Sequence, residues 1–169
     1  GGPPQLWDSA TGAQLATTAP GAAYAWGIAI SSDGNRIISG GRDKCVHVFD
    51  VTTNTEVAVL HGHTRTITNV TLSPDASRAL TLSFDGFARL WNIEQQSEIA
   101  SRQLVDETTV WENYWIGDIR FPTLQSRPAD SWSISGLFDE SCAFSADGRF
   151  AFLGSKDKTI SVLDAKTGT

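Results

Sequence analysis

Three histidines stand where metal chemistry is conceivable. His61-Gly62-His63 has the spacing of a paired metal ligand, and His47 lies within the apolar run CVHVFD. A zinc site needs three or four protein ligands in compatible geometry, and no third ligand lies close to the pair in the sequence. The pattern therefore predicts no metal site, and nothing in it calls for a cofactor.

Three aspartates, Asp43, Asp85 and Asp157, recur in a way that could suggest a catalytic carboxylate set. They recur, however, with the period of a longer repeat, which indicates turn chemistry, because an Asp in a turn accepts hydrogen bonds from nearby backbone N–H groups. The sequence has no Gly-Lys-Ser/Thr phosphate loop, no nucleophile elbow and no paired-cysteine site. We therefore expect no enzyme activity.

The chain carries one unit several times. SSDGNRIISGGRDKCVHVFDVTTN, SPDASRALTLSFDGFARLWNIEQQ and SADGRFAFLGSKDKTISVLDAKTG align without gaps, and a partial copy, LWDSATG, precedes them. The acidic or amide residue that closes each run falls at Asp8, Asp50, Asn92 and Asp164, at spacings of 42, 42 and 72 residues. A period near 42 residues restricts the chain to a few repeat architectures.

The pattern inside each unit is that of strands. Short apolar, β-branched runs such as RIISG, CVHVFD and TISVLD are separated by turn formers such as SDG, PDA and KTG, and no segment sustains a helical period. Four strands of about five residues with tight turns use roughly 40 residues, which is one antiparallel blade of a propeller.

The unit at 62–104 resembles a WD repeat. Gly62-His63 opens it, Ser73-Pro74-Asp75 forms its first turn and Leu90-Trp91-Asn92 ends its strand, an ending that Trp7-Asp8 repeats. The resemblance covers nearly all of the chain except a segment between Leu104 and Ile134. It implies an all-β fold, a β-propeller of the WD-repeat type with about three four-stranded antiparallel blades plus an aromatic-rich insertion.

The resemblance also implies a buried polar network in which a histidine joins a hydroxyl and an indole and is held by an aspartate. The residues at these positions are His63, Thr81, Asp85 and Trp91. The preceding unit has Ser39 and Asp43 but Phe49 in place of the indole and Gly21 in place of the histidine, and the last unit keeps only Asp157. We expect these residues to stabilise the fold and to take no part in catalysis.

The spacings divide the chain into consecutive pieces. We expect the third and outer strands of one blade at 5–18, a blade at 21–60, a blade at 62–104, an insertion at 105–134 and a blade at 135–164 that lacks its outer strand. The chain has no methionine and begins inside a strand, which suggests a piece of a longer protein.

Three periods are fewer than the four or more blades of a closed propeller, so further blades are needed. They could come from the rest of a longer chain or from a second copy that closes a six-bladed ring. As a third possibility, the insertion acts as a degenerate fourth blade, closed by the N-terminal strand beside Ser161 to Asp164.

Family members often bind partners through the propeller face that carries the Gly-His loops, at positions set relative to the histidine and the turn aspartate. Aromatic residues and arginine at such positions are typical of binding hot spots, and the insertion adds further aromatic residues. The predicted partner face consists of Tyr24, Trp26, Arg42, Thr66, Thr68, Phe84, Phe138, Glu140 and Lys156, with Trp111 and Trp115 from the insertion.

Composition limits the partner classes. The formal net charge is −6 and the 13 Lys and Arg residues are scattered, so we expect no nucleic-acid ligand. No apolar stretch reaches the ~20 residues of a membrane span, so we expect no membrane partner. The only two cysteines, Cys45 and Cys142, lie two units apart and favour free thiols in a reducing, cytoplasmic compartment.

The sequence thus predicts a non-catalytic scaffold that binds a protein or peptide through the face carrying the Gly-His loops. Two alternatives stay open. In one, the domain is the sensor module of a larger regulatory ATPase or protease-like effector. In the other, it is a propeller enzyme or carbohydrate binder that uses the 105–134 insertion.

Overall fold

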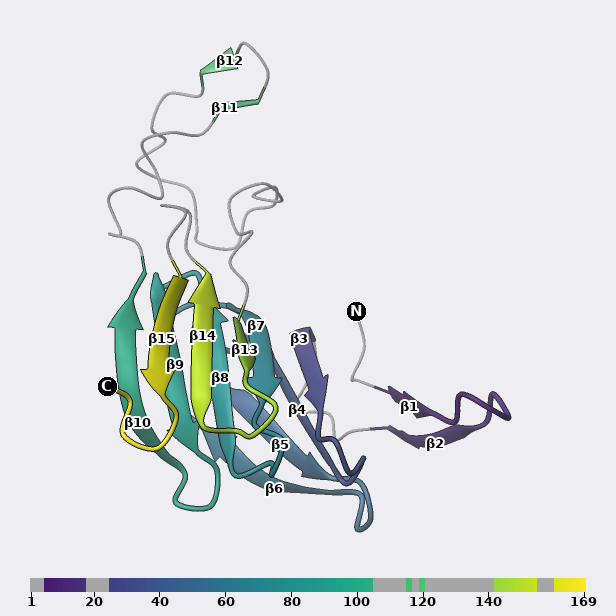
Figure 1. The fold of residues 1–169 in the computed structure, drawn as a ribbon. Coiled ribbons are helices and arrows are strands. Elements are labelled where there is room, and N and C mark those ends of the chain that lie inside the picture. The colour runs from purple at the N-terminus through teal and green to yellow at the C-terminus, as the bar shows by residue number, and fades with distance from the viewer. Residues whose placement is uncertain (1–4, 18–24, 105–114, 117–118, 121–141, 155–159) are drawn as a thin grey trace.

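The computed structural model describes residues 5–17, 25–104, 115–116, 119–120, 142–154 and 160–169 (Figure 1). Every regular element in these ranges is a β-strand, and most strands form three antiparallel sheets of three or four strands. The prediction of an all-β fold with antiparallel sheets of the propeller-blade type is confirmed. This part of the chain contains no helix that is long and apolar enough to cross a membrane.

Each sheet follows the chain order of its strands. The first blade is β3-β4-β5-β6, the second is β7-β8-β9-β10 and the third is β13-β14-β15, and short hairpins β1-β2 and β11-β12 stand apart from them. The strands span β1 Gln5–Trp7, β2 Gln14–Thr17, β3 Ala25–Ile30, β4 Arg36–Gly41, β5 Val46–Asp50, β6 Thr55–Leu60, β7 Ile67–Leu72, β8 Arg78–Ser83, β9 Phe87–Asn92, β10 Ser97–Gln103, β11 Trp115–Ile116, β12 Ile119–Arg120, β13 Cys142–Phe144, β14 Phe150–Gly154 and β15 Ile160–Asp164.

The turn between the first two strands of a blade is held by its own side chains. In the second blade the Ser73 hydroxyl donates to Asp75 Oδ1 over 2.6 Å and accepts from the Arg78 backbone N–H over 3.0 Å. The Ser73 hydrogen bond keeps the pKa of Asp75 below its ordinary value. The same two bonds recur in the other blades at Ser31 and Asp33 and at Ser145 and Asp147.

The turn between the last two strands is also capped locally. The Oδ1 atom of Asp50 accepts from the backbone N–H three residues later over 3.0 Å, and Asn92 accepts in the same way over 2.8 Å. Asp8 and Asp164 make the equivalent bonds after β1 and β15. The acidic or amide residue that marks the repeat is therefore the residue that caps the turn after its strand.

The apolar core lies between blades. Innermost strand β7 packs beside β3 on one side and beside β13 on the other (Figure 1). One cluster joins the first and second blades and is made of Ile38, Val46, Val48, Ala58, Leu60, Ile67, Val70, Leu72, Ala79, Trp91 and Ile93. A second cluster joins the second and third blades and is made of Leu80, Leu82, Ala88, Leu90, Ala151, Leu153 and Leu163. Each sheet is thus stabilised through its neighbours.

Gly40 lies where the first two blades approach each other closely. It lies in β4 facing β7, where an added Cβ would stand 2.6 Å from Cγ2 of Ile67 and 3.1 Å from Cγ1 of Val70. Because Ile67 is completely buried, its side chain has little room to move away. A side chain at position 40 would push the two blades apart.

We expect Gly40→Ala to lower the free energy of unfolding by about 1–3 kcal/mol, the usual range for overpacking a filled core. Urea titration monitored by tryptophan fluorescence measures the change. In an Ile67→Ala background the clashing methyl group is gone, so the same substitution should be much less harmful. An equal loss in both backgrounds would show that the contact with Ile67 is not the cause.

Candidate functional site

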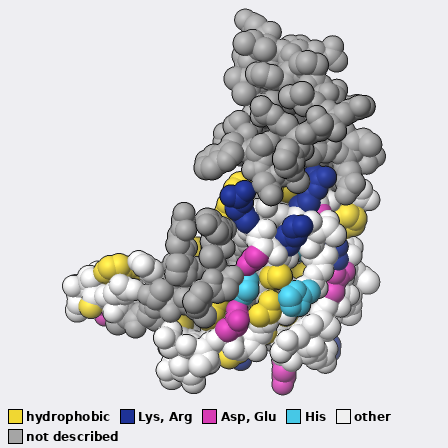
Figure 2. Space-filling view, turned by 180° about the vertical axis from the view of Figure 1, so that it is seen from behind, with side chains coloured by type: hydrophobic (Ala, Val, Ile, Leu, Met, Phe, Trp, Pro, Cys, Tyr) yellow, Lys and Arg dark blue, Asp and Glu magenta, His cyan; other side chains and the backbone are white. Residues whose placement is uncertain are grey.

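The candidate site lies at one end of the blades, which we name the Gly-His end. It contains the β4–β5 turn at 42–45, the β8–β9 turn at 84–86 and the β6–β7 loop at 61–66, and it is the upper end in Figure 1. Its described cations are Arg42, Lys44, Arg65 and Arg102. Figure 2 shows Lys and Arg side chains gathered at this end of the surface.

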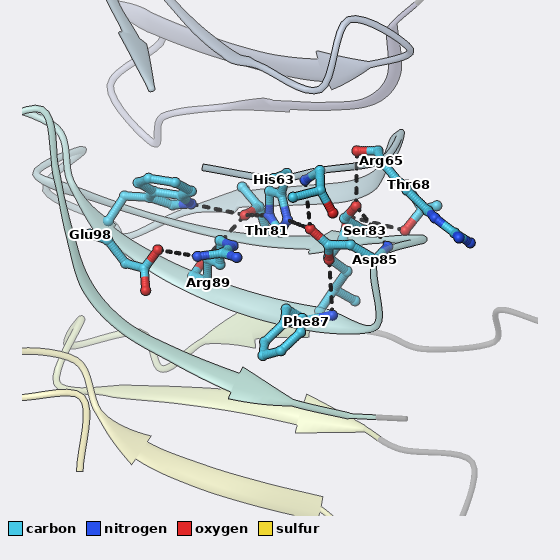
Figure 3. Close-up of polar contacts among 12 residues, drawn as sticks. His63, Arg65, Thr68, Thr81, Ser83, Asp85, Phe87, Arg89 and Glu98 are labelled. Carbon is cyan, nitrogen blue, oxygen red and sulfur yellow. Dashed lines mark hydrogen bonds and ion pairs between the residues drawn. The ribbon is translucent and has the colours of Figure 1, made fainter. Parts of the chain in front are cut away.

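A relay of hydrogen bonds lies beneath this end in the second blade (Figure 3). The Trp91 indole N–H donates to Thr81 Oγ1 over 2.9 Å. Thr81 Oγ1 is 2.8 Å from His63 Nε2, and His63 Nδ1 is 2.8 Å from Asp85 Oδ2. All four side chains are buried. The structure therefore brings together the four residues that the WD resemblance placed in one network.

One assignment of protons satisfies the whole relay. A neutral imidazole has one donor and one acceptor, so His63 Nδ1–H donates to Asp85 while Nε2 accepts from the Thr81 hydroxyl. Asp85 also accepts from the backbone N–H groups of Thr64 and Phe87, each over 3.0 Å. Burial raises the pKa of Asp85, but the bonds from His63, Thr64 and Phe87 outweigh it and hold the pKa below 3.8. The relay ties the β6–β7 loop to strands β8 and β9.

Gly62 is required by the same packing. A Cβ at this position would come within 2.9 Å of the outermost ring atom of Trp91, Cη2. The ring of Trp91 is itself 1% exposed and packs edge-on against His63, with ring centroids 6.0 Å apart. The glycine before the histidine thus makes room for the indole that the histidine helps to position.

In the first blade, the turn aspartate Asp43 is held by a different histidine, His47. Asp43 Oδ2 lies 2.8 Å from Nε2 of His47, and Nδ1 of the same ring lies 2.5 Å from Glu56 Oε1. Both ring nitrogens donate only in an imidazolium, which would satisfy both carboxylates. Ser39 is fully buried at the position of Thr81, and its hydroxyl has no partner among the described residues.

The His47–Glu56 pair was missed by sequence reasoning, which treated His47 only as an unsupported metal ligand. The signal was available as a spacing: Arg89 and Glu98 stand at the equivalent positions one period later and form an ion pair of their own. In both blades a basic side chain on the third strand meets a glutamate nine residues later on the outer strand.

Two aromatic side chains from different blades meet at the Gly-His end. Trp26 at the start of β3 and Phe84 after β8 pack edge to face, with ring centroids 5.4 Å apart and an interplanar angle of 89°. Trp26 is still 57% exposed. The contact orders a large aromatic surface at the junction of the two blades, with Arg42 exposed in the β4–β5 turn.

The other predicted face residues differ in their accessibility. Thr66 is buried and its carbonyl accepts from the Phe84 N–H, and Thr68 is half-buried and donates to the Leu82 carbonyl. Trp115 begins β11, and its side chain is not among those described. The remaining predicted residues lie outside the described residues: Tyr24, Trp111, Phe138, Glu140, Lys156 and, from the structural set, Asp157.

The described residues contain no group of three or more His, Cys, Asp or Glu that could hold a metal ion. His61, two residues before His63, instead contacts Cys45, with Nδ1 3.3 Å from Sγ. Burial, followed by the charges of Asp43 and Glu56, raises the pKa of Cys45. A thiol with a raised pKa is a weak metal ligand and a weak nucleophile at neutral pH.

Blades of antiparallel strands packed through their apolar faces, with a buried histidine relay, define a β-propeller protein. Residues 13–50, 54–92 and 140–164 match the family model described as WD domain, G-beta repeat. The chain belongs to this WD-repeat family, as the resemblance of its repeats predicted. WD-repeat domains serve in general as non-catalytic scaffolds for protein interaction.

Similar proteins carry the same repeats within longer chains. Pre-mRNA-processing factor 19 of Mus musculus is 30% identical over 155 residues, which cover 82% of this chain and 30% of the relative. Nuclear distribution protein PAC1 of Arthroderma otae is 30% identical over 139 residues, which cover 80% and 28%. Protein tipD of Dictyostelium discoideum is 42% identical over 67 residues, which cover 40% and 11%. The chain thus spans less than a third of the length of these relatives.

Because only the second blade has the relay, substitutions at equivalent positions of the first and second blades should change the free energy of unfolding by different amounts. Thr81→Val removes the hydroxyl that bonds both His63 and Trp91, so two buried polar groups lose their partner and the free energy of unfolding should fall by about 2 kcal/mol or more. Ser39→Ala in the first blade should change it by only about 0.5 kcal/mol or less. Urea unfolding of both variants tests this, and equal losses would show that the relay has no special role.

Acid should weaken the second blade through Asp85. Its pKa in the folded state lies below the ordinary value of 3.8, so its contribution to stability is fully present above about pH 4 and is lost as the pH falls through the folded pKa. The gap in unfolding free energy between wild type and Asp85→Asn should therefore narrow below about pH 4. Urea titrations over a series of pH values measure the gap, and a constant gap would contradict the expectation.

Proposed function

We propose that this chain is a non-catalytic scaffold that docks a protein or peptide at its Gly-His end. The observation that carries the proposal is Trp26, which is more than half exposed and yet ordered by its contact with Phe84 on the neighbouring blade. A rigid, exposed aromatic side chain is a typical hot-spot anchor, because little conformational entropy is lost when a partner covers it.

The charges near Trp26 favour an acidic partner. Arg42, Lys44 and Arg65 occupy the turn and loop beside the aromatic pair, and Asp43 and Asp85 at the same end are each engaged by a histidine. A basic rim around an aromatic anchor suits a peptide with an apolar residue flanked by carboxylates. The net charge of −6 disfavours nucleic acid as the natural ligand. We expect no membrane partner. Because the two free thiols favour a reducing compartment, we propose the cytoplasm as the location.

Other roles have weaker support. The carbohydrate-binding or enzymatic alternative depends on the 105–134 insertion, of which the structure describes only 115–116 and 119–120. The sensor-module alternative depends on domains beyond this chain. Docking at the Gly-His end uses described residues, including Trp26, Arg42 and Phe84. We further propose that additional blades complete this surface, because a closed propeller has about four blades or more.

The proposal is tested with peptides selected against the wild-type protein from a random display library and measured by fluorescence polarisation. Trp26→Ala should weaken binding about tenfold or more, as expected for loss of an anchor. Arg42→Ala should weaken binding most at low salt, because its contribution is electrostatic. The selected peptides should be rich in Asp and Glu.

Lys166→Ala is the matched control, since Lys166 is an exposed cation in the turn after β15, at the opposite end of the blades. It should leave the affinity unchanged. Circular dichroism should show that all three variants keep the wild-type fold. If Trp26→Ala binds as wild type does, or if it unfolds the protein, the docking surface is not at the Gly-His end.

A further inference from the structure

His47 in the first blade contacts two carboxylates at once. Its Nε2 lies 2.8 Å from Asp43 Oδ2, and its Nδ1 lies 2.5 Å from Glu56 Oε1. A neutral imidazole has one N–H donor, whereas two ionised carboxylates at these positions need two donors. The three side chains together therefore hold one proton more than a neutral ring and two carboxylates would carry.

The histidine of the second blade needs no extra proton. His63 has Asp85 on one ring nitrogen and the Thr81 hydroxyl on the other. Because a hydroxyl can donate as well as accept, a neutral ring satisfies both of these partners. The two blades thus hold their turn aspartates with rings that differ in charge.

The turn that His47 helps to hold contains a strained residue. Lys44 has a φ of 69° although it is not glycine, and the same turn position one period later is Gly86, with a φ of 82°. A residue with a Cβ is unfavourable in this left-handed conformation. The described partners of Asp43 are the Cys45 backbone N–H, over 3.3 Å, and His47. The contact with His47 is the shorter of the two and is charge-assisted, so it contributes more to holding Asp43.

Loss of the extra proton would break one of the two contacts. The lone pair of a neutral ring would then face a carboxylate oxygen at hydrogen-bond distance, which is repulsive. The side chains of Asp43 and Glu56 are 32% and 30% exposed, so each can turn toward water. The first blade gains one negative charge in either case, and if Asp43 moves, the turn that carries Arg42 and Lys44 loses its anchor.

The other described groups beside His47 differ from it in their chemistry. Its cross-strand partners, Ser39 on β4 and Val59 on β6, carry no charge. Cys45 lies two residues earlier, and its pKa is raised, first by burial, so its thiol stays neutral where histidines change charge. His61 is exposed and contacts Cys45, so its titration needs a control of its own.

We propose that His47 makes docking at the Gly-His end pH-dependent, because its imidazolium form holds the β4–β5 turn and its neutral form releases it. The effect on binding rests on the docking function proposed above, whereas the protonation of His47 can be measured on the protein alone. An acidic peptide should bind more tightly at about pH 6 than at about pH 8, the range in which histidine side chains change charge.

The first measurement is NMR of the imidazole nitrogens of His47 in the whole chain, which needs no peptide. His47 should carry a proton on both ring nitrogens at about pH 6 and lose one as the pH rises to about 8. The backbone amide signals of Lys44 and Cys45 should shift with it. A ring with one proton at about pH 6, or a ring whose protonation does not change over this range, would overturn the proposal.

The second measurement is fluorescence polarisation with one of the selected peptides rich in Asp and Glu. The affinity of the wild type should fall about two- to fivefold from about pH 6 to about pH 8, the size of effect expected from one surface charge pair. Glu56→Gln should remove this fall, because the Gln amide can donate to Nδ1 of a neutral His47 while its Nε2–H still donates to Asp43. His61→Gln is the matched control and should keep the fall.

His47→Gln is a second variant that removes the titrating group, so its affinity should be the same at both pH values. Circular dichroism verifies the fold, and if Glu56→Gln or His47→Gln unfolds the protein, the other variant decides. An affinity that does not change with pH in the wild type, or a change that both variants retain, would show that His47 does not control docking. Selected peptides that bind without Trp26 would instead contradict the docking surface, and the NMR result would still decide the protonation of His47.

Discussion

A blade of a propeller has two apolar faces, and a neighbouring blade must cover each of them. Only the second blade has both neighbours within the described part of this chain, and its Trp91 is 1% exposed. Because burial of apolar surface is the main favourable term in folding, the stability of each blade depends on the presence of the next. The first two blades leave no room for a Cβ at Gly40 beside Ile67, which shows how closely they pack.

Buried polar side chains add hydrogen bonds to this packing, and the first and second blades differ in these bonds. In the second blade Thr81 joins an indole and an imidazole, and each buried donor or acceptor in the relay has a partner. In the first blade Ser39 keeps the hydroxyl without those neighbours, while His47 has taken over the contact with Asp43. The turn aspartate is thus held by two different arrangements in the two blades.

The repeat and the strands could be predicted because they depend on residues at fixed spacings within one unit, and the relay of His63 could be predicted because the resemblance to WD repeats implies it. The contact of Trp26 with Phe84 could not be predicted, because these residues are 58 positions apart in different blades and their contact depends on how two sheets pack. The pairing of His47 with Glu56 was also missed, although its spacing recurs at Arg89 and Glu98. The register of β5 and β6 shifts between Val48 and Phe49, and simple alternation along the strands does not reveal which side chains then meet.

The serine and aspartate that close the first turn of every blade also bear on how the chain folds. Each turn is held by bonds within about five residues of sequence, and such short loops close on a sub-microsecond scale, far faster than distant strands meet. The hairpins β3-β4, β7-β8 and β13-β14 can therefore form independently, each with its strand alignment set in advance. In a chain built from similar repeats, this local closure acts against strand exchange between blades, which is the characteristic way in which repeat proteins misfold.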